Sequence, residues 1–539
     1  MTRTATVPVE ISQFLNTVLN RANTPMEPVS YKVNWGDAPL HHKVYADAPR
    51  RVLPPPFATL GDEPASSCLE RLVDAPLLSR AHEQLLSDLL MCYGQLDRRA
   101  ELNWNEDALR KLSATDALWG RPTASGGGMY PLEQYLVAGR GSTFPVGTGH
   151  YSSAAHGLDI LDHADRTDAL ARATGTSSAS YLVVTCRFWK NSFKYNTFCY
   201  HVVSQDLGCL LGSWRAVAAA HGLRLNPLYN VDDDLICAEL GLDGLHEAPY
   251  AVLALEPRPA AAAPVAVAPE RRVGPRGGEN GHAVLEASRT TRTFPLVDKA
   301  HAACFMEGCE RPPVETVRPT ETPAGPVIDL PRVRGGLSTE QMLRERRSGF
   351  GAFCRRTGMT VEQLSTGLRM VALMAREPHD LAPLPREPWV GQWAIVAGVV
   401  GLADGAYRYL DDTHQLVRAG TQQLRELQRF YPLTNYSLGE VSVVHVMTAR
   451  LASLIAQAGA RGMRTTNVEI GQAGQAMYLA AAAFGFGAGA VLGLDNLEID
   501  KFLGIDRSGE QSLLCHLLGA HRPTQSRAVL PLHSHGGAQ

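Results

Sequence analysis

The spacing of apolar residues in the first half of the chain predicts buried strands and a long helix. Leu132–Ala138 and Ala248–Leu255 are short apolar runs typical of buried strands. Tyr181–Cys186 is rich in the β-branched and aromatic residues that favour strands. Residues from about 200 to 221 predict a helix that ends at Gly222. This half therefore predicts a mixture of helix and sheet.

Two further stretches predict helices. Residues 78–112 carry leucines on one helical face, as a helix packed against a core does. Ile470–Leu494 carries no charge and is long enough to span a membrane. It contains Gln472 and Gln475, however, and acidic rather than basic residues flank it. We expect a buried helix followed by a glycine-rich turn.

The periodic pattern breaks between Glu256 and Gly281, where proline, alanine and glycine indicate a linker. A chain of 539 residues is also too long for one core. We therefore expect an N-terminal arm or small lobe (1–80), a first domain (81–256), the linker (257–284), a second domain (285–530) and a tail (531–539).

The second half of the chain repeats the first at a separation of roughly 260 residues. Gln205–Gly208 recurs as the related Glu469–Gly471, and Gln134–Gly139 recurs as Gln392–Gly398. A repeat of this length predicts two tandem copies of one α+β fold.

Composition narrows the function. The formal net charge of −3 leaves no basic excess for binding nucleic acid or an anionic membrane. The ten cysteines are scattered without zinc-ligand spacing, so we expect no metal site and reduced thiols in the cytoplasm. The N-terminus lacks the apolar stretch of a signal peptide.

The loop Arg121–Pro131 is the strongest candidate for a binding site. Gly126–Gly128 has no Cβ atoms, so a flat or anionic ligand can approach the main chain. Ser125 adds a hydroxyl, and Arg121 adds a guanidinium suited to phosphate or carboxylate. The spacing matches neither a P-loop nor a dinucleotide fingerprint, so the residues alone favour a glycine-rich turn before a strand.

This loop reads R-P-x-x-S-G-G-x-x-Y-P-x-E-x-Y-L and resembles the flavin loop of SagB/ThcOx-type dehydrogenases. These are FMN-dependent enzymes of the nitroreductase fold that oxidise thiazolines and oxazolines to azoles in ribosomally made peptides. The resemblance implies that Arg121, Ser125, Gly126 and Gly127 bind FMN. It also implies an α+β fold of two tandem nitroreductase-like domains. Each would have a central, mostly antiparallel sheet flanked by helices, and the two would form a pseudo-dimer within one chain.

Three adjacent residues resemble the phosphate-binding opening of nitroreductase domains, namely Arg346, Arg347 and Ser348. Two guanidinium groups and a hydroxyl suit a dianionic phosphate, although the residues alone favour a charged helix surface. Thr360–Ser365 resembles the capped helix that follows this opening, and Ser288–Phe294 is a weaker competing match.

The resemblance adds two positions near the C-terminus. It implies that Arg527 is a second phosphate ligand and that the backbone at Gly493 faces the flavin ring. A solvated arginine in the tail and a tight chain reversal explain the same two residues without a ligand.

The two halves carry different parts of the motif set. The first half has no Arg-Arg-Ser opening, and its nearest string, Asp97–Ala100, lacks the serine. In the second half, Pro385–Gly391 places bulky and charged residues where the glycine loop would lie. The resemblance implies that the phosphate motif and the ring loop come from opposite halves. We therefore expect one FMN per chain and the loss of the symmetry-related site.

Lys194 and Tyr195 follow the predicted strand Tyr181–Cys186, and we expect a polar turn between them and it. The resemblance implies that this pair is catalytic and lies over the flavin. Burial lowers the pKa of a lysine, and a neighbouring cation lowers that of a tyrosine, so either group can act as the base. The residues alone also fit a surface lysine beside a packing tyrosine. The second half offers Arg464–Thr466 instead of such a pair.

The expected function is the FMN-dependent oxidation of azolines in a precursor peptide already cyclised by cyclodehydratase partners. Two alternatives remain open. One is an NAD(P)H-dependent reductase of nitro, ene or quinone compounds, and the other is a flavin-free scaffold of a peptide-modifying complex. Pairing of two chains as a homodimer is also left open.

Overall fold

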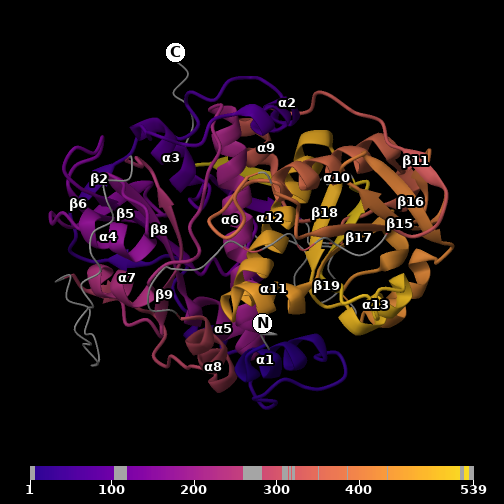
Figure 1. Cartoon of the computed structure of the whole chain (residues 1–539), viewed down its shortest axis with the longest axis horizontal. Helices are drawn as coiled ribbons and strands as arrows, with labels where there is room; N and C mark the ends of the chain where they lie inside the picture. The colour runs from indigo at the N-terminus through magenta and orange to yellow at the C-terminus, as the bar shows by residue number, and fades with distance from the viewer. Residues whose placement is uncertain are drawn as a thin grey trace, which may run out of the picture.

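The computed structural model contains two antiparallel sheets on either side of a pair of long central helices (Figure 1). It describes residues 7–101, 118–258, 282–305, 314, 317, 322–349, 351–384, 386–433, 435–522 and 527–532. Most of the predicted linker lies outside these residues. We refer to the parts before and after the linker as the first half and the second half.

The first-half sheet has six strands in the order β2-β7-β6-β5-β8-β9, all antiparallel. The strands are β2 (Arg50–Val52), β7 (Gly157–Asp162), β6 (Gly147–Ser152), β5 (Leu132–Ala138), β8 (Ser180–Arg187) and β9 (Glu247–Ala254). The three strands predicted from apolar runs are β5, β8 and β9. They are buried almost throughout, which explains their near-continuous apolar sequence.

The second-half sheet has seven strands in the order β11-β16-β15-β13-β17-β19-β18, also antiparallel. The strands are β11 (Val327–Asp329), β16 (Gln415–Gly420), β15 (Gly405–Leu410), β13 (Gly391–Val396), β17 (Val443–Ala449), β19 (Gln511–Gly519) and β18 (Gly487–Val491). The register shifts after Thr148 in β6 and after Ala406 in β15, which occupy equivalent places in the two sheets. The repeat therefore extends to the local irregularities of the sheets.

Helices cover both sheets. In the first half they are α1 (Val9–Leu19), α2 (Ala65–Arg71), α3 (Glu83–Met91), α4 (Thr167–Thr174), α5 (Phe188–Tyr195), α6 (Cys199–Ala220) and α7 (Asp233–Leu240). In the second half they are α8 (Pro295–Cys304), α9 (Thr339–Glu345), α10 (Val361–Ala375), α11 (Leu451–Ala458), α12 (Arg461–Phe484) and α13 (Asn496–Leu503). The capped helix predicted at Thr360 is α10, and its capping box joins Thr360 and Gln363.

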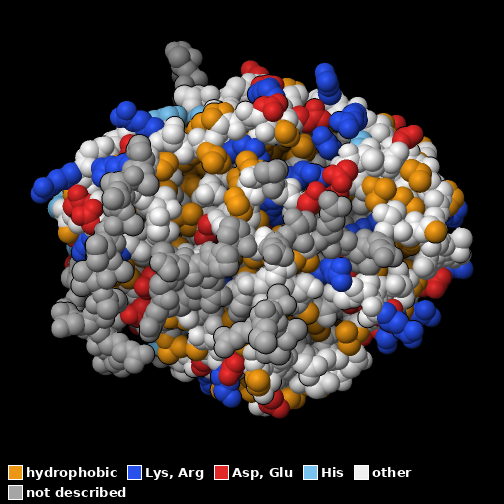
Figure 2. All heavy atoms as spheres, viewed as in Figure 1, with side chains coloured by type: hydrophobic (Ala, Val, Ile, Leu, Met, Phe, Trp, Pro, Cys, Tyr) orange, Lys and Arg blue, Asp and Glu red, His pale blue; other side chains and the backbone are white. Residues whose placement is uncertain are grey.

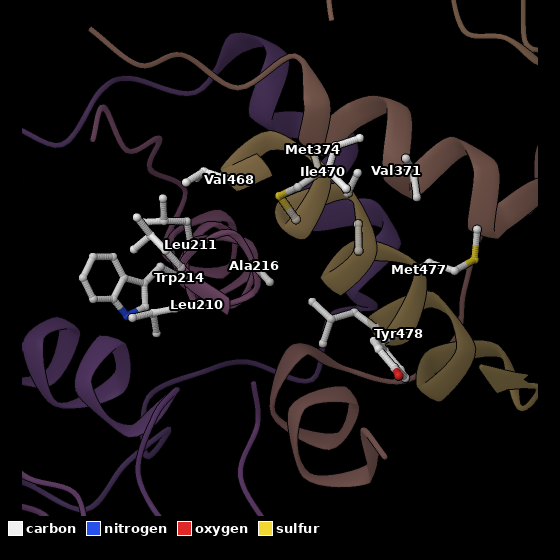
Figure 3. Close-up of a cluster of buried hydrophobic side chains, with 14 of the residues drawn as sticks. Leu210, Leu211, Trp214, Ala216, Val371, Met374, Val468, Ile470, Met477 and Tyr478 are labelled. Carbon is white, nitrogen blue, oxygen red and sulfur yellow. The ribbon is translucent and has the colours of Figure 1, made fainter. Parts of the chain in front are cut away.

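The two halves pack through α6 and α12, which lie side by side at the centre of the molecule (Figures 1 and 3). Two glycines permit this close approach. A Cβ on Gly208 would lie 2.0 Å from the Val468 carbonyl oxygen, and one on Gly471 would lie 2.0 Å from the Gln205 carbonyl oxygen. In Figure 3, Trp214 points from α6 away from α12. The structure is thus a tandem α+β pseudo-dimer with one continuous core across its centre.

Segments from each half also reach the other half. β20 (Arg527–Pro531) pairs with β3 (Asp97–Glu101), which pairs with β4 (Leu118–Gly120). A short pair also joins β1 (Val44–Tyr45) to β10 (Val284–Leu285) across the halves, whereas β12 (Met359–Thr360) pairs with β14 (Val399–Val400) within the second half. The β20–β3 pair places the end of the chain beside the first half.

A duplicated hydrogen-bond cluster marks the internal repeat. The ring of His156 joins the Ser87 hydroxyl at 2.9 Å and the Tyr151 hydroxyl at 3.0 Å. In the second half, the ring of His414 joins the hydroxyls of Ser365 and Tyr409 at 2.9 and 2.8 Å. Both histidines have positive φ. Because both halves keep the same buried cluster, its role is structural.

Three local predictions were wrong. The helix predicted over 78–112 contains the shorter α3 and, among its described residues, the strand β3. The glycine-rich turn after α12 is the strand β18, and the polar turn after Tyr181–Cys186 is the helix α5. The residues assigned to the N-terminal arm or small lobe contain the helices α1 and α2.

Among the described residues, no helix combines the length and the apolar character needed to cross a membrane. Figure 2 shows basic and acidic side chains interspersed over the visible face, in keeping with the small net charge.

Candidate functional site

A cavity of about 1090 Å³ is lined by residues from both halves. Ten of the eleven predicted site residues line it, namely Arg121, Ser125, Gly126, Gly127, Lys194, Tyr195, Arg346, Arg347, Ser348 and Gly493. The volume is at the upper end of the range for small-molecule sites, roughly 300–1,000 Å³, so it has room for more than one small ligand. The roles of these residues stay predictions.

The glycine loop forms one wall of this cavity as a short 3-10 turn, Gly126–Gly128. Gly127 has a φ of 61° and Gly128 a φ of 70°, so both lie in the region that glycine adopts without strain. The Tyr130 amide donates a hydrogen bond to the Ser125 hydroxyl oxygen at 2.9 Å. The wall thus exposes main chain rather than side chains to the cavity.

Asp206 on α6 anchors the glycine loop through two hydrogen bonds. Its carboxylate accepts a hydrogen bond from the Ser125 hydroxyl at 2.6 Å and another from the Gly126 amide at 2.7 Å. Asp206 is buried and lines the cavity. Burial raises its pKa to about 7, against the two hydrogen bonds that favour the ionised form.

Lys194 and Tyr195 are the last two residues of α5 and lie against the glycine loop. The Lys194 ammonium is 3.4 Å from the Gly127 carbonyl oxygen and 5.3 Å from the centre of the Tyr195 ring. A Cβ on Gly127 would lie 2.6 Å from both the Lys194 Nζ and the Tyr195 hydroxyl. Only glycine therefore leaves this pair its present space.

The pKa shifts of the pair distinguish its two members. Burial lowers the pKa of Lys194. Burial, together with the nearby Asp206 carboxyl and Tyr436, raises the pKa of Tyr195. The lowering of a tyrosine pKa that we considered from the sequence is therefore not found here. Lys194 is the member whose proton is more easily lost than usual.

Arg346 and Ser348 reach the same cavity from the segment after α9. The Arg346 guanidinium is buried, donates from Nη2 to the Arg121 carbonyl oxygen at 2.9 Å and lies over the Tyr478 ring. Its Nε has no hydrogen-bond partner, and no described carboxylate is within ion-pair distance. Burial lowers its pKa. Ser348 lies 3.2 Å from the Tyr478 hydroxyl. A buried cation without a counter-charge is suited to an anionic ligand.

Arg121 lines the cavity, and its guanidinium contacts other parts of the protein. It donates to the Tyr93 carbonyl oxygen at 2.8 Å and lies 4.0 Å from the centre of the Tyr130 ring. Its backbone oxygen accepts the bond from Arg346. In this structure Arg121 links the glycine loop to the Arg346 segment.

Gly493 lines the cavity beside Tyr431 and Leu433, each 2.9 Å from the Cβ that a larger residue would carry. Arg527 begins β20, where its Cα pairs with that of Glu101. The side chain of Arg527 lies outside the described residues, so its predicted phosphate contact stays a prediction.

The residues that line the cavity without having been predicted include Asp206, Arg98 and Arg21. Asp206 was noticed only as part of the repeat, and Arg98 only as part of an incomplete match. Arg98 lies over the Trp119 ring, and its Nε is buried without a partner. Arg21, from the arm, donates to the carbonyl oxygens of residues next to Gly493. The adjacent residues Arg98 and Arg99 were the signal in the sequence for a basic side of the cavity.

The equivalent place in the other half is filled by charged side chains. Arg386, in the counterpart of the glycine loop, donates to the Glu469 carboxylate at 2.6 Å, and both side chains are buried. Glu469 occupies the position on α12 that Asp206 occupies on α6. Nearby, Glu377 pairs with Arg224 at 2.9 Å and Arg215 at 3.5 Å. The expected charged insertion at this place is therefore present, as an ion-pair network.

Comparisons with known proteins point to one fold. Residues 392–520 match the Nitroreductase family. The solved structure of a candidate nitroreductase from Anabaena variabilis matches with a TM-score of 0.69 and 20% identity over 95% of this chain and 99% of its own. The chain has a nitroreductase fold. Because this match spans both halves, the tandem nitroreductase arrangement is shared with that structure.

Two further similarities are partial. A candidate nitroreductase of Methanocaldococcus jannaschii is 27% identical over 184 residues, which are 33% of this chain and 89% of the relative. A chain of the Escherichia coli microcin synthetase complex with a truncated precursor bound is 18% identical over 33% of this chain and 70% of its own, with a TM-score of 0.29. The nitroreductase family points to an oxidoreductase.

Proposed function

We propose that this protein is an FMN-dependent dehydrogenase that oxidises thiazolines or oxazolines to azoles in a ribosomally made precursor peptide. One observation carries the proposal. The Lys194–Tyr195 pair, the glycine loop and the Arg346–Ser348 segment line a single cavity although they come from both halves of the chain. These are the parts that the resemblance to SagB/ThcOx-type dehydrogenases assigns to one flavin site.

The residues of the cavity fit FMN, a group that the nitroreductase family usually binds. Arg346 has a buried Nε without a partner, which suits a phosphate oxygen. The cavity surface at Gly126 and Gly127 is main chain, which suits a flat ring. Arg347, Ser348 and Arg98 would complete the phosphate end, and Gly493 would lie at the ring. When bound, FMN supplies an acceptor for a hydride equivalent.

The residues of this chain would handle the proton. Aromatisation removes one hydride equivalent and one proton from the azoline ring, so a base must take the proton as the hydride leaves. Lys194 has a lowered pKa and is the better base of the pair. Tyr195 keeps its proton because its pKa is raised. Its hydroxyl would therefore donate a hydrogen bond that orients the azoline ring. The half-buried position of both residues limits water at the reacting atoms.

We further propose that each chain binds one FMN. The Arg386–Glu469 pair occupies the place of the glycine loop in the second cleft, so a flavin ring there would have to displace a buried ion pair. The substrate would be a cyclised precursor peptide supplied by cyclodehydratase partners in the cytoplasm.

A direct test incubates the FMN-loaded protein with a peptide that carries azoline rings, in air, and measures peptide mass. We expect each ring to lose the mass of two hydrogen atoms. Rapid bleaching of the flavin by NADPH with no change in peptide mass would instead identify a reductase. A protein that binds no flavin would be a scaffold.

A further inference from the structure

The cavity contains a buried carboxyl group to which the proposed mechanism assigns no task. Asp206 lines the cavity from α6, and its two oxygens accept hydrogen bonds from the Ser125 hydroxyl and the Gly126 amide. No described cation lies within ion-pair distance of it. Buried carboxylates are normally paired with a cation because an isolated buried charge is costly.

The counterpart of Asp206 in the other half shows the usual arrangement. The Glu469 carboxylate is held by the Arg386 guanidinium at 2.6 Å. At the place of Arg386, the first half has the glycines of the loop. The first half therefore has an open cavity where the second half has a guanidinium, and no described cation pairs with Asp206.

Four uncharged ionisable groups lie close enough to Asp206 to interact with its charge, namely Tyr93 after α3, Cys186 on β8, Tyr195 on α5 and Cys209 one turn further along α6. The cations Lys194 and Arg346 line the same cavity but form no described ion pair with Asp206. Burial raises the pKa of all four, so each stays protonated at neutral pH. Asp206, with a pKa of about 7, is the group of this set that can change its charge there.

We propose that Asp206 takes up a proton when the cofactor in the cavity is reduced, and that it thereby compensates the negative charge that the cofactor gains. This inference rests on the proposed function. Asp206 acts through Ser125, which faces the ligand, and is therefore a positioning residue.

The hydrogen bond between Ser125 and Asp206 provides a way for the protonation of Asp206 to reach the ligand. With Asp206 ionised, the Ser125 hydroxyl donates to it at 2.6 Å. With Asp206 protonated, its own O–H donates to the Ser125 oxygen, and the Ser125 hydrogen turns towards the cavity. The pair would then present a donor to the reduced, more negative ligand.

The proton balance follows. The azoline loses a hydride equivalent to FMN and a proton to Lys194. Lys194 returns to its neutral form when that proton reaches solvent or Asp206. If Asp206 takes it, the cavity as a whole gains no net charge.

The test measures protons taken up per two electrons during anaerobic photoreduction of the FMN-loaded protein in weakly buffered solution with a pH indicator. At about pH 8, Asp206 is ionised in the oxidised protein, and we expect the wild type to take up about one proton more than Asp206→Asn. At about pH 5.5, Asp206 is already protonated, and the two proteins should agree. Equal uptake at both pH values would overturn the inference.

A second variant keeps the test decisive if Asp206→Asn binds no FMN. Ser125→Ala removes a donor that favours the ionised carboxylate, so the pKa of Asp206 should rise further. The pH dependence of proton uptake should shift to higher pH in this variant, and an unshifted profile would refute the proposal. A wild-type protein that binds no FMN at any pH would refute the proposed function itself. A wild-type protein that binds FMN but takes up no more protons than Asp206→Asn would refute only the role of Asp206.

Discussion

The two halves of this chain are built from equivalent elements but differ at the cleft, beside Asp206 in one half and beside Glu469 in the other. In one cleft, Gly126 and Gly127 leave a cavity beside Asp206. In the other, Arg386 enters the equivalent space and pairs with Glu469. The two halves therefore differ in how equivalent space is used, with an open cavity in one and an internal charge pair in the other.

The rest of the repeat has changed less than the clefts. Thr185 donates to Glu247 in the first sheet, and Thr448 donates to Glu510 in the second. The Ser–His–Tyr cluster is also present in both halves. Structural hydrogen bonds are thus present in duplicate, whereas the residues at the cavity and at its counterpart differ.

The largest expected difference between the cavity and its counterpart in the second half is at Lys194. Replacement by Met should lower azoline oxidation about 10²–10⁴-fold, the usual contribution of a general base, with FMN still bound. Peptide mass spectrometry gives the rate and absorbance gives the flavin content. The matched control is Gln457→Met, at the equivalent position of α11, which should leave both unchanged. Equal losses in the two variants would contradict a single working cleft.

Breaking the Arg386–Glu469 ion pair should lower the stability of the protein but not its activity. Arg386→Met leaves Glu469 buried without its partner and should lower the free energy of unfolding by about 3–5 kcal/mol. Replacing both partners, as Arg386→Met with Glu469→Leu, should recover most of it. Denaturant titration measures both, and FMN content should not change. A double variant as unstable as the single one would show that the pair has another role.

Arg346→Met should weaken FMN binding about 10- to 100-fold, because a hydrogen bond to a charged group contributes about 1.5–3 kcal/mol. Quenching of FMN fluorescence on titration with apoprotein gives the dissociation constant. The control, Arg376→Met, removes an arginine that pairs with Asp411 away from the cavity and should bind FMN as the wild type does. Unaltered affinity in Arg346→Met would exclude this residue from the site.

Because the pKa of Asp206 is raised, we expect the free energy of unfolding of the apoprotein to depend on pH. Its pKa of about 7 when folded exceeds the usual carboxyl value, so its stabilising contribution is complete at low pH and is lost as pH rises through 7. Between about pH 5.5 and 8 the wild type should lose about 2 kcal/mol relative to Asp206→Asn. Urea unfolding at the two pH values measures the difference, and a constant difference would show that Asp206 is not neutral in the acidic folded state.

Much of the fold could be predicted from local sequence, and the errors have a common cause. The limits of β5 were predicted residue for residue because Leu132–Ala138 is buried along its whole length. The strand β3 was read as part of a helix, although it pairs with β4 and with β20, which lies more than 400 residues away in the chain. β18 is rich in glycine and is a strand because it pairs with β19. Pairing with other strands overrides local preference in both cases.

The candidate site divides in the same way. Glycines and paired arginines are visible as motifs, and ten of the predicted residues reach one cavity. The lack of a described cation beside the buried Asp206 carboxyl cannot be read from the sequence, because it depends on the residues of a loop roughly 80 positions earlier in the chain.

The central claim is that one cleft binds a flavin and the other cannot. The most direct measurement is the ratio of FMN to protein after saturation and removal of free ligand, from flavin absorbance and amino-acid analysis. The account predicts one FMN per chain in the wild type and in Arg386→Met. A ratio of two, or no bound flavin at all, would contradict it.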